Sequence, residues 1–90
     1  MDSSEVFERV IEILRPYAKN QAGIADASHD THLLDDLKIN SARLVDIVLA
    51  FEDEFDIGIS DDDLEEVSTV GSAVELIMSA REGLAAVAGA

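Results

Sequence analysis

Residues 33–48 read Leu-Leu-Asp-Asp-Leu-Lys-Ile-Asn-Ser-Ala-Arg-Leu-Val-Asp-Ile-Val and deliver a serine, Ser41, to the first turn of an amphipathic helix. Asn40 or Ser41 can cap this helix, because their side-chain oxygens accept hydrogen bonds from the first free amides. Apolar residues then recur at helical spacing and should face the core: Leu44, Ile47, Val48, Phe51 and Phe55. The pattern predicts a helix over 41–54 with one buried face.

A second surface of the same helix is apolar without belonging to that buried stripe. Ala42, Val45 and Leu49 lie on it, bordered by acidic side chains. We expect part of this apolar area to stay exposed and to serve as a docking surface. The residues predicted to bind partners are Ala42, Arg43, Val45, Asp46, Leu49, Glu52 and Asp53.

Three further helices are predicted on either side of this one. The first covers 4–17 and should kink or end near Pro16, which lacks a backbone donor. A short third helix over 61–66 begins with a capping-box pattern, Ser60 and Asp63. Thr69 caps a final helix that lasts to about Glu82. The fold class is therefore all-α, a four-helix bundle with a short third helix.

The first and second helices are joined by a long loop over residues 20–36, which is rich in turn-forming residues. Loops of this length need anchors into the core. We expect four residues to provide them: Ile24, Leu33, Leu34 and Leu37.

The chain has 90 residues, enough for one small domain and too few for a deep catalytic cavity. We divide it into a helical bundle over 1–82 and a flexible Ala/Gly tail over 83–90. No nucleophile elbow, phosphate loop or carboxylate cleft is recognisable, so the chain is not expected to be an enzyme. His29 and His32 fall in the long loop without further ligands, and no metal site is predicted.

The formal net charge is -14, which excludes nucleic acids as partners and favours basic protein surfaces. Ten acidic side chains and no basic one lie between residues 46 and 66. The chain contains no cysteine, so any thiol chemistry must be supplied by another group. The N-terminus lacks the features of a secretory signal and no apolar run could cross a bilayer, so we expect a cytoplasmic monomer without membrane insertion.

The stretch around Ser41 resembles the prosthetic-group motif of acyl carrier proteins, in which an Asp-Ser-Leu triplet opens the second helix. The resemblance covers roughly residues 5–80 and includes the Leu-Leu-Asp-Asp-Leu segment and the Ile57-Gly58-Ile59 segment. It implies that Ser41 bears covalent 4′-phosphopantetheine, whose thiol carries acyl groups as thioesters. A helix start would favour the phosphate of this arm through its free amides and dipole.

The resemblance also implies partners and a shelter for the cargo. A phosphopantetheinyl transferase would load the arm, and acyl-transfer or synthase enzymes of fatty acid, lipid or polyketide synthesis, with basic docking surfaces, would use it. In the family, the acyl chain can withdraw among the helices. The residues that we expect to line this shelter are Leu44, Ile47, Phe51 and Ile59.

The motif departs from the family pattern at three positions. Lys38 stands where glycine is frequent, Asn40 replaces the aspartate before the serine, and Ala42 replaces the leucine after it. These changes make the site less acidic, and they are compatible either with a specialised partner set or with positions that tolerate change. Two alternative functions stay open: a peptidyl or aminoacyl carrier, and an acidic protein-interaction adaptor that is never modified.

Overall fold

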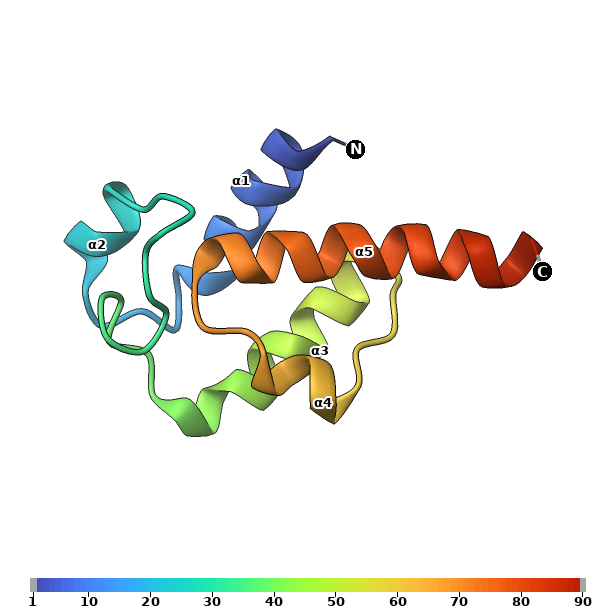
Figure 1. Cartoon of the computed structure of the whole chain (residues 1–90). Helices are drawn as coiled ribbons and strands as arrows, with labels where there is room; N and C mark the ends of the chain where they lie inside the picture. The colour runs from blue at the N-terminus through green and yellow to red at the C-terminus, as the bar shows by residue number, and fades with distance from the viewer. Residues whose placement is uncertain (1, 90) are drawn as a thin grey trace.

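The computed structural model describes the backbone of residues 2–89 and the side chains of residues 2–60 and 62–81. Within this part the chain forms helices and connecting loops, without a β-strand (Figure 1). The elements are α1 (Ser3–Leu14), α2 (Gln21–Ala25), the 3₁₀ helix η1 (Ser41–Arg43), α3 (Leu44–Phe55), α4 (Asp61–Glu65) and α5 (Val70–Gly89). The predicted all-α bundle with a long first connection is confirmed.

Capping residues set the starts of the helices. The Asp2 side chain accepts a hydrogen bond from the Glu5 amide at 3.0 Å and begins α1. The predicted capping box is present at α4, where the side chains of Ser60 and Asp63 each accept from the other's backbone amide. Thr69 accepts from the Ser72 amide at 3.1 Å, as expected for the cap of α5.

Helix α1 ends at Leu14, earlier than the predicted end at Tyr17. Pro16 has no amide hydrogen to continue the ladder of hydrogen bonds, so the chain turns instead. The Tyr17 and Ala18 amides both bond to the Leu14 carbonyl, at 2.9 and 3.1 Å.

The long connection contains α2, a five-residue helix that the sequence pattern does not reveal. The Asn20 side chain caps it by accepting from the Gly23 amide at 3.1 Å. Ile24 is buried and anchors this helix as predicted. A helix this short does not complete two turns, so no apolar periodicity can mark it.

Three of the four predicted loop anchors are buried: Ile24, Leu33 and Leu37. The prediction for Leu34 is wrong, because its side chain is 40% exposed. Leu33 and Leu34 are neighbours in a non-helical turn, where successive side chains point in different directions and only one can reach the core.

The helices pack their predicted faces into one core. On α3 the side chains of Ile47, Val48, Phe51 and Phe55 are buried and Leu44 is half-buried. On α5 the buried residues are Val70, Ala73, Val74 and Ile77. Helix α1 packs against both α5 and α3.

Helix α5 continues past the predicted end at Glu82 to Gly89 (Figure 1). Alanine has the highest helix propensity, and the Ala-rich end of the chain is compatible with this continuation. The side chains of residues 82–90 lie outside the described part, and the flexibility of the 83–90 tail stays a prediction. Within the described residues, none of the helices combines the length and apolar character needed to span a membrane.

Candidate functional site

Ser41 is the first residue of η1, a single turn that leads directly into α3. Its side chain is exposed, and no hydrogen bond among the described residues uses its hydroxyl. The hydroxyl therefore lacks an internal base that would make it a nucleophile in its own right. It can instead accept a group that another enzyme brings to it.

Asn40 holds the turn that presents Ser41. Its side-chain oxygen accepts from the Ala42 amide at 2.9 Å, and its carbonyl oxygen accepts from the Arg43 amide at 2.8 Å. An amide oxygen makes this cap as a carboxylate would, so the replacement of aspartate by Asn40 removes a charge and keeps the geometry.

The same contacts correct one expectation about the start of this helix. A phosphate was expected to bind free amides there, but the Ala42 and Arg43 amides are already hydrogen-bonded to Asn40. The cap residue competes for the amides that an anion would use. The exposed hydroxyl, and not a ring of free amides, is what the site offers to a modifying group.

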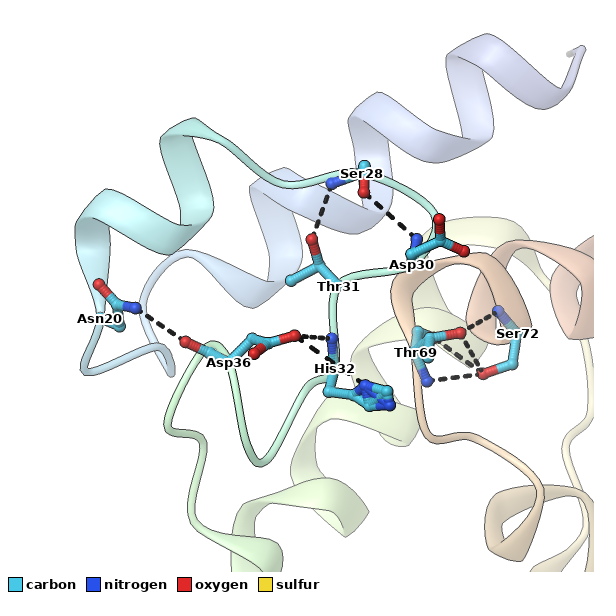
Figure 2. Close-up of polar contacts among 8 residues, drawn as sticks. All are labelled: Asn20, Ser28, Asp30, Thr31, His32, Asp36, Thr69 and Ser72. Carbon is cyan, nitrogen blue, oxygen red and sulfur yellow. Dashed lines mark hydrogen bonds and ion pairs between the residues drawn. The ribbon is translucent and has the colours of Figure 1, made fainter.

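The loop before Ser41 is held by its own polar contacts (Figure 2). The Asp36 carboxylate accepts from the His32 amide at 2.8 Å, and the Asp36 carbonyl accepts from the Asn20 side chain at 2.8 Å. Leu37 and Ile39 on either side of Lys38 are buried. The approach to the serine is thus anchored while the serine itself stays accessible.

The start of α5 forms hydrogen bonds with the other side of this loop. The Val70 amide donates to the Thr31 carbonyl at 2.9 Å, and the Gly71 amide donates to the His29 carbonyl at 2.8 Å. His32 and Thr69 form an isolated antiparallel bridge, and Thr69 and Ser72 bond to each other beside it (Figure 2). The loop, α5 and the connection after α4 therefore meet at one end of the molecule.

Lys38 adopts a left-handed backbone conformation, with φ of 57°. This conformation lets the buried side chains of Leu37 and Ile39 both reach the core across a sharp turn. It favours glycine, because a Cβ atom crowds the following carbonyl oxygen. Lys38 is exposed, and it takes part in none of the ion pairs among the described side chains.

The seven predicted docking residues share one side of η1 and α3, which we call the α3 face. Val45 and Leu49 are 55% and 57% exposed, so the predicted apolar exposure is confirmed. Ala42, Arg43 and Asp53 are also exposed, whereas Asp46 and Glu52 are half-buried. An Arg43 guanidinium nitrogen lies 3.2 Å from an Asp46 carboxylate oxygen.

Some of the acidic side chains have internal partners that the sequence does not reveal. The Glu52 carboxylate accepts from the Ile59 amide at 3.0 Å and so fixes the chain after α3. Glu54 forms an ion pair with Arg9 of α1 at 2.9 Å. Arg9 and Glu54 are 45 residues apart, and Glu52 and Ile59 are seven apart across the end of α3, so the helical spacing of three or four residues could not identify either contact.

A hollow of about 420 Å³ lies beside the start of α3. Its apolar lining comes from Leu34 of the loop, Leu44 of α3, Leu64 of α4 and Val67. His32, Asp35, Glu65 and Ser68 complete its rim. Leu34, which is not a core anchor, lines this hollow instead.

Only one of the four residues predicted to shelter a cargo, Leu44, lines this hollow. Ile47 and Phe51 belong to the buried core, and Ile59 is half-buried. No group of three His, Cys, Asp or Glu residues among the described ones is placed to hold a metal ion. His29 instead packs its ring against Phe7, with ring centroids 4.9 Å apart.

Comparison with known proteins identifies the family of the chain. A family model described as a phosphopantetheine attachment site matches residues 12–77, which include Ser41 and most of the α3 surroundings. The mitochondrial acyl carrier protein of Saccharomyces cerevisiae is 36% identical over 81 residues, which cover 88% of this chain and 65% of the yeast protein. The acyl carrier protein of Petrotoga mobilis is 38% identical over 77 residues, 86% of this chain and 88% of that protein.

A solved structure of the acyl carrier protein from Enterococcus faecalis has a similar fold. It superposes with a TM-score of 0.74 at 34% sequence identity. The superposition covers 89% of this chain and 99% of that one.

Proposed function

Because the chain belongs to the acyl carrier proteins, a family of non-catalytic carriers with covalent 4′-phosphopantetheine, we propose that Ser41 is the residue that bears this arm. The observation that carries the proposal is the position of the Ser41 hydroxyl at the start of η1, exposed and without a hydrogen-bond partner among the described residues. A transferase can reach it there, and the Asn40 cap holds the turn that carries it.

Attachment would form a bond between the Ser41 oxygen and the phosphorus of the arm's phosphate, which makes a phosphodiester. The pyrophosphate bond of coenzyme A would break, adenosine 3′,5′-bisphosphate would leave, and the hydroxyl proton would pass to a base on the transferase. When bound, the arm supplies the thiol that this cysteine-free chain lacks, and an acyl group is held on it as a thioester. The protein's own contribution is placement. Buried Leu37 and Ile39 fix the loop, and the Asn40 cap fixes the turn.

The hollow beside the start of α3 supports a role in sheltering the acyl chain. Four apolar side chains line it, and its volume of about 420 Å³ exceeds that of a short aliphatic chain. Each methylene group moved there from water would contribute about 0.8 kcal/mol. An acyl chain carried on an arm at Ser41 could therefore withdraw from solvent between the loop, α3 and α4.

The α3 face supports docking of enzymes that handle acyl groups in fatty acid, lipid or polyketide synthesis. Val45 and Leu49 offer an apolar contact area at its centre. Asp46 and Asp53 border this area and would steer a basic enzyme surface toward it.

Intact-mass measurement after incubation with coenzyme A and a panel of phosphopantetheinyl transferases tests the proposal. Wild-type protein should gain the mass of one arm, and Ser41→Ala should gain none. Ser79→Ala is the matched control, because Ser79 is also an exposed serine but lies on α5. Loading of Ser41→Ala, or no loading of wild type by any transferase, would contradict the proposal, and the second result would favour an unmodified adaptor.

A further inference from the structure

Lys38 and Arg43 are the only lysine or arginine residues between positions 20 and 80, and both lie within three residues of Ser41. Both side chains are exposed, that of Arg43 by 63%. An acidic protein thus places its two central positive charges on either side of the serine. Their position in the sequence does not by itself explain these two charges. The energetic cost of placing a basic residue at each position points to a role.

The backbone at Lys38 has a conformation that is unfavourable for a lysine. At a φ of 57°, any residue with a Cβ atom costs roughly 1–2 kcal/mol relative to the right-handed conformation, and glycine avoids most of that cost. Such strain is found most often at sites of function. The Lys38 side chain offsets none of it through an ion pair with a described residue.

The positive charge of Arg43 also contributes little to the stability of the fold. It is the N-cap residue of α3, and cations at that end of a helix oppose the helix dipole. Its ion pair with Asp46 is exposed, and pairs of this kind contribute about 0–1 kcal/mol. Neither basic residue is therefore explained by the stability of the fold.

We propose that Lys38 and Arg43 form a basic contact for a carboxylate-bearing rim on the phosphopantetheinyl transferase that loads Ser41. The inference rests on the proposed function. A transferase must bring its active site onto the Ser41 oxygen, so the exposed residues Lys38 and Arg43, within three positions of that serine, are placed to contact it. Charge complementarity then requires acidic groups on the enzyme at this point.

Positive charge would thus lie only at the end of the α3 face beside the serine, where Lys38 precedes the face and Arg43 pairs with Asp46. Val45 and Leu49 form the apolar centre, and Asp53 marks the far, acidic end. A transferase with acidic groups near its active site and basic groups farther away fits in one direction only. A uniformly basic enzyme surface would meet repulsion at the serine, which selects against the wrong partner.

Two measurements with the transferase that loads wild type fastest test the inference. The first is kcat/KM for arm transfer to Lys38→Glu, Arg43→Glu and the control Lys19→Glu, which makes the same charge change at an exposed residue before α2. Each of the first two should lose about tenfold or more, which corresponds to about 1.4 kcal/mol, and the control less than about twofold. Thermal unfolding of each variant verifies that it is folded.

The second measurement is zero-length carbodiimide cross-linking, which joins an amine to a carboxylate in direct contact. The chain has only two lysines, Lys19 and Lys38, so peptide mapping shows which of the two is linked. A link from Lys38 to an acidic residue of the transferase, lost in Lys38→Gly, supports the inference. Equal kcat/KM for all three glutamate variants, or links from Lys19 alone, overturns it while leaving Ser41 as the attachment site. Failure to load wild type at all would instead refute the proposed function and this inference with it.

Discussion

The side-chain oxygen of Asn40 lies 2.9 Å from the amide nitrogen of Ala42 and closes the turn that presents Ser41. This contact links the stability of a helix start to the accessibility of one hydroxyl. A side chain that both caps the turn and flanks the serine can be changed in charge without being changed in geometry. The pair Asn40→Asp and Asn40→Ala separates these two properties.

Asn40→Ala should lower the free energy of unfolding by about 1 kcal/mol, because the Ala42 amide loses its cap. Asn40→Asp keeps an acceptor and places a negative charge at the helix start, so its stability should equal or exceed that of wild type. Urea denaturation monitored by circular dichroism measures both. Equal stability of Asn40→Ala and wild type would show that the cap contributes nothing.

Lys38→Gly should raise the free energy of unfolding by about 0.5–1 kcal/mol. Glycine relieves the left-handed backbone at this position, and the gain is reduced by the greater freedom of glycine in the unfolded chain. Lys38→Ala is the control, since alanine keeps the Cβ atom and should give no such gain. A loss of stability in Lys38→Gly would mean that the lysine charge, by relieving repulsion among acids, supports the fold and would weaken the docking argument.

Gly71→Ala should destabilise the protein by about 1–3 kcal/mol. A Cβ atom at Gly71 would lie 2.8 Å from the His29 carbonyl oxygen and would push the loop away from the start of α5. Gly58→Ala is the matched control, because a Cβ atom there has no neighbour within 4 Å. Thermal unfolding of the two variants should differ clearly, and similar melting temperatures would argue against the close approach of loop and helix.

Leu49→Ala should change the free energy of unfolding by less than about 0.5 kcal/mol, whereas Ile47→Ala should lower it by about 2–5 kcal/mol. Leu49 is 57% exposed on the α3 face, and Ile47 is buried two residues away. Leu49→Ala should nevertheless weaken association with acyl-handling enzymes, measurable as a higher KM. An unchanged KM across several such enzymes would remove Leu49 from the docking surface.

The melting temperature should rise with ionic strength, because a net charge of -14 opposes compaction and salt screens it. Differential scanning calorimetry from low salt to about 1 M, where the Debye length is about 3 Å, measures the effect. Sodium and choline chloride should act alike if screening is the cause. A melting temperature that stays constant or falls would contradict the prediction.

The sequence predicted the long helices well because each carries a repeated signal. Apolar spacing identified α1, α3 and α5, and the Ser60 and Asp63 capping pair identified the short α4. Helix α2 was missed because five residues hold too little periodicity. The predicted burial of Leu34 was wrong, because the position of an apolar residue in a turn does not show which way its side chain points.

The candidate site was predictable in part for the same reason. Ser41, with Val45 and Leu49 on the exposed side of its helix, follows from local spacing. The bond from the Glu52 carboxylate to the Ile59 amide, and the hollow that joins Leu34 to Leu64, depend on segments brought together by folding. Lys38 stands where the family often has glycine, but a lysine does not itself indicate a left-handed backbone, and the coordinates were needed to show it.

Interactions between residues three or four apart depend only on local sequence. They determined the helices and their caps, and therefore the position of the serine at the start of the second long helix. Tertiary packing decided which loop residues reach the core, which acidic groups are used internally and where a hollow opens beside Leu44. These features depend on contacts between distant segments, whose free energy appears only once the core has formed. For this reason the motif could be found from the sequence, while the hollow and the long-range contacts around it required the structure.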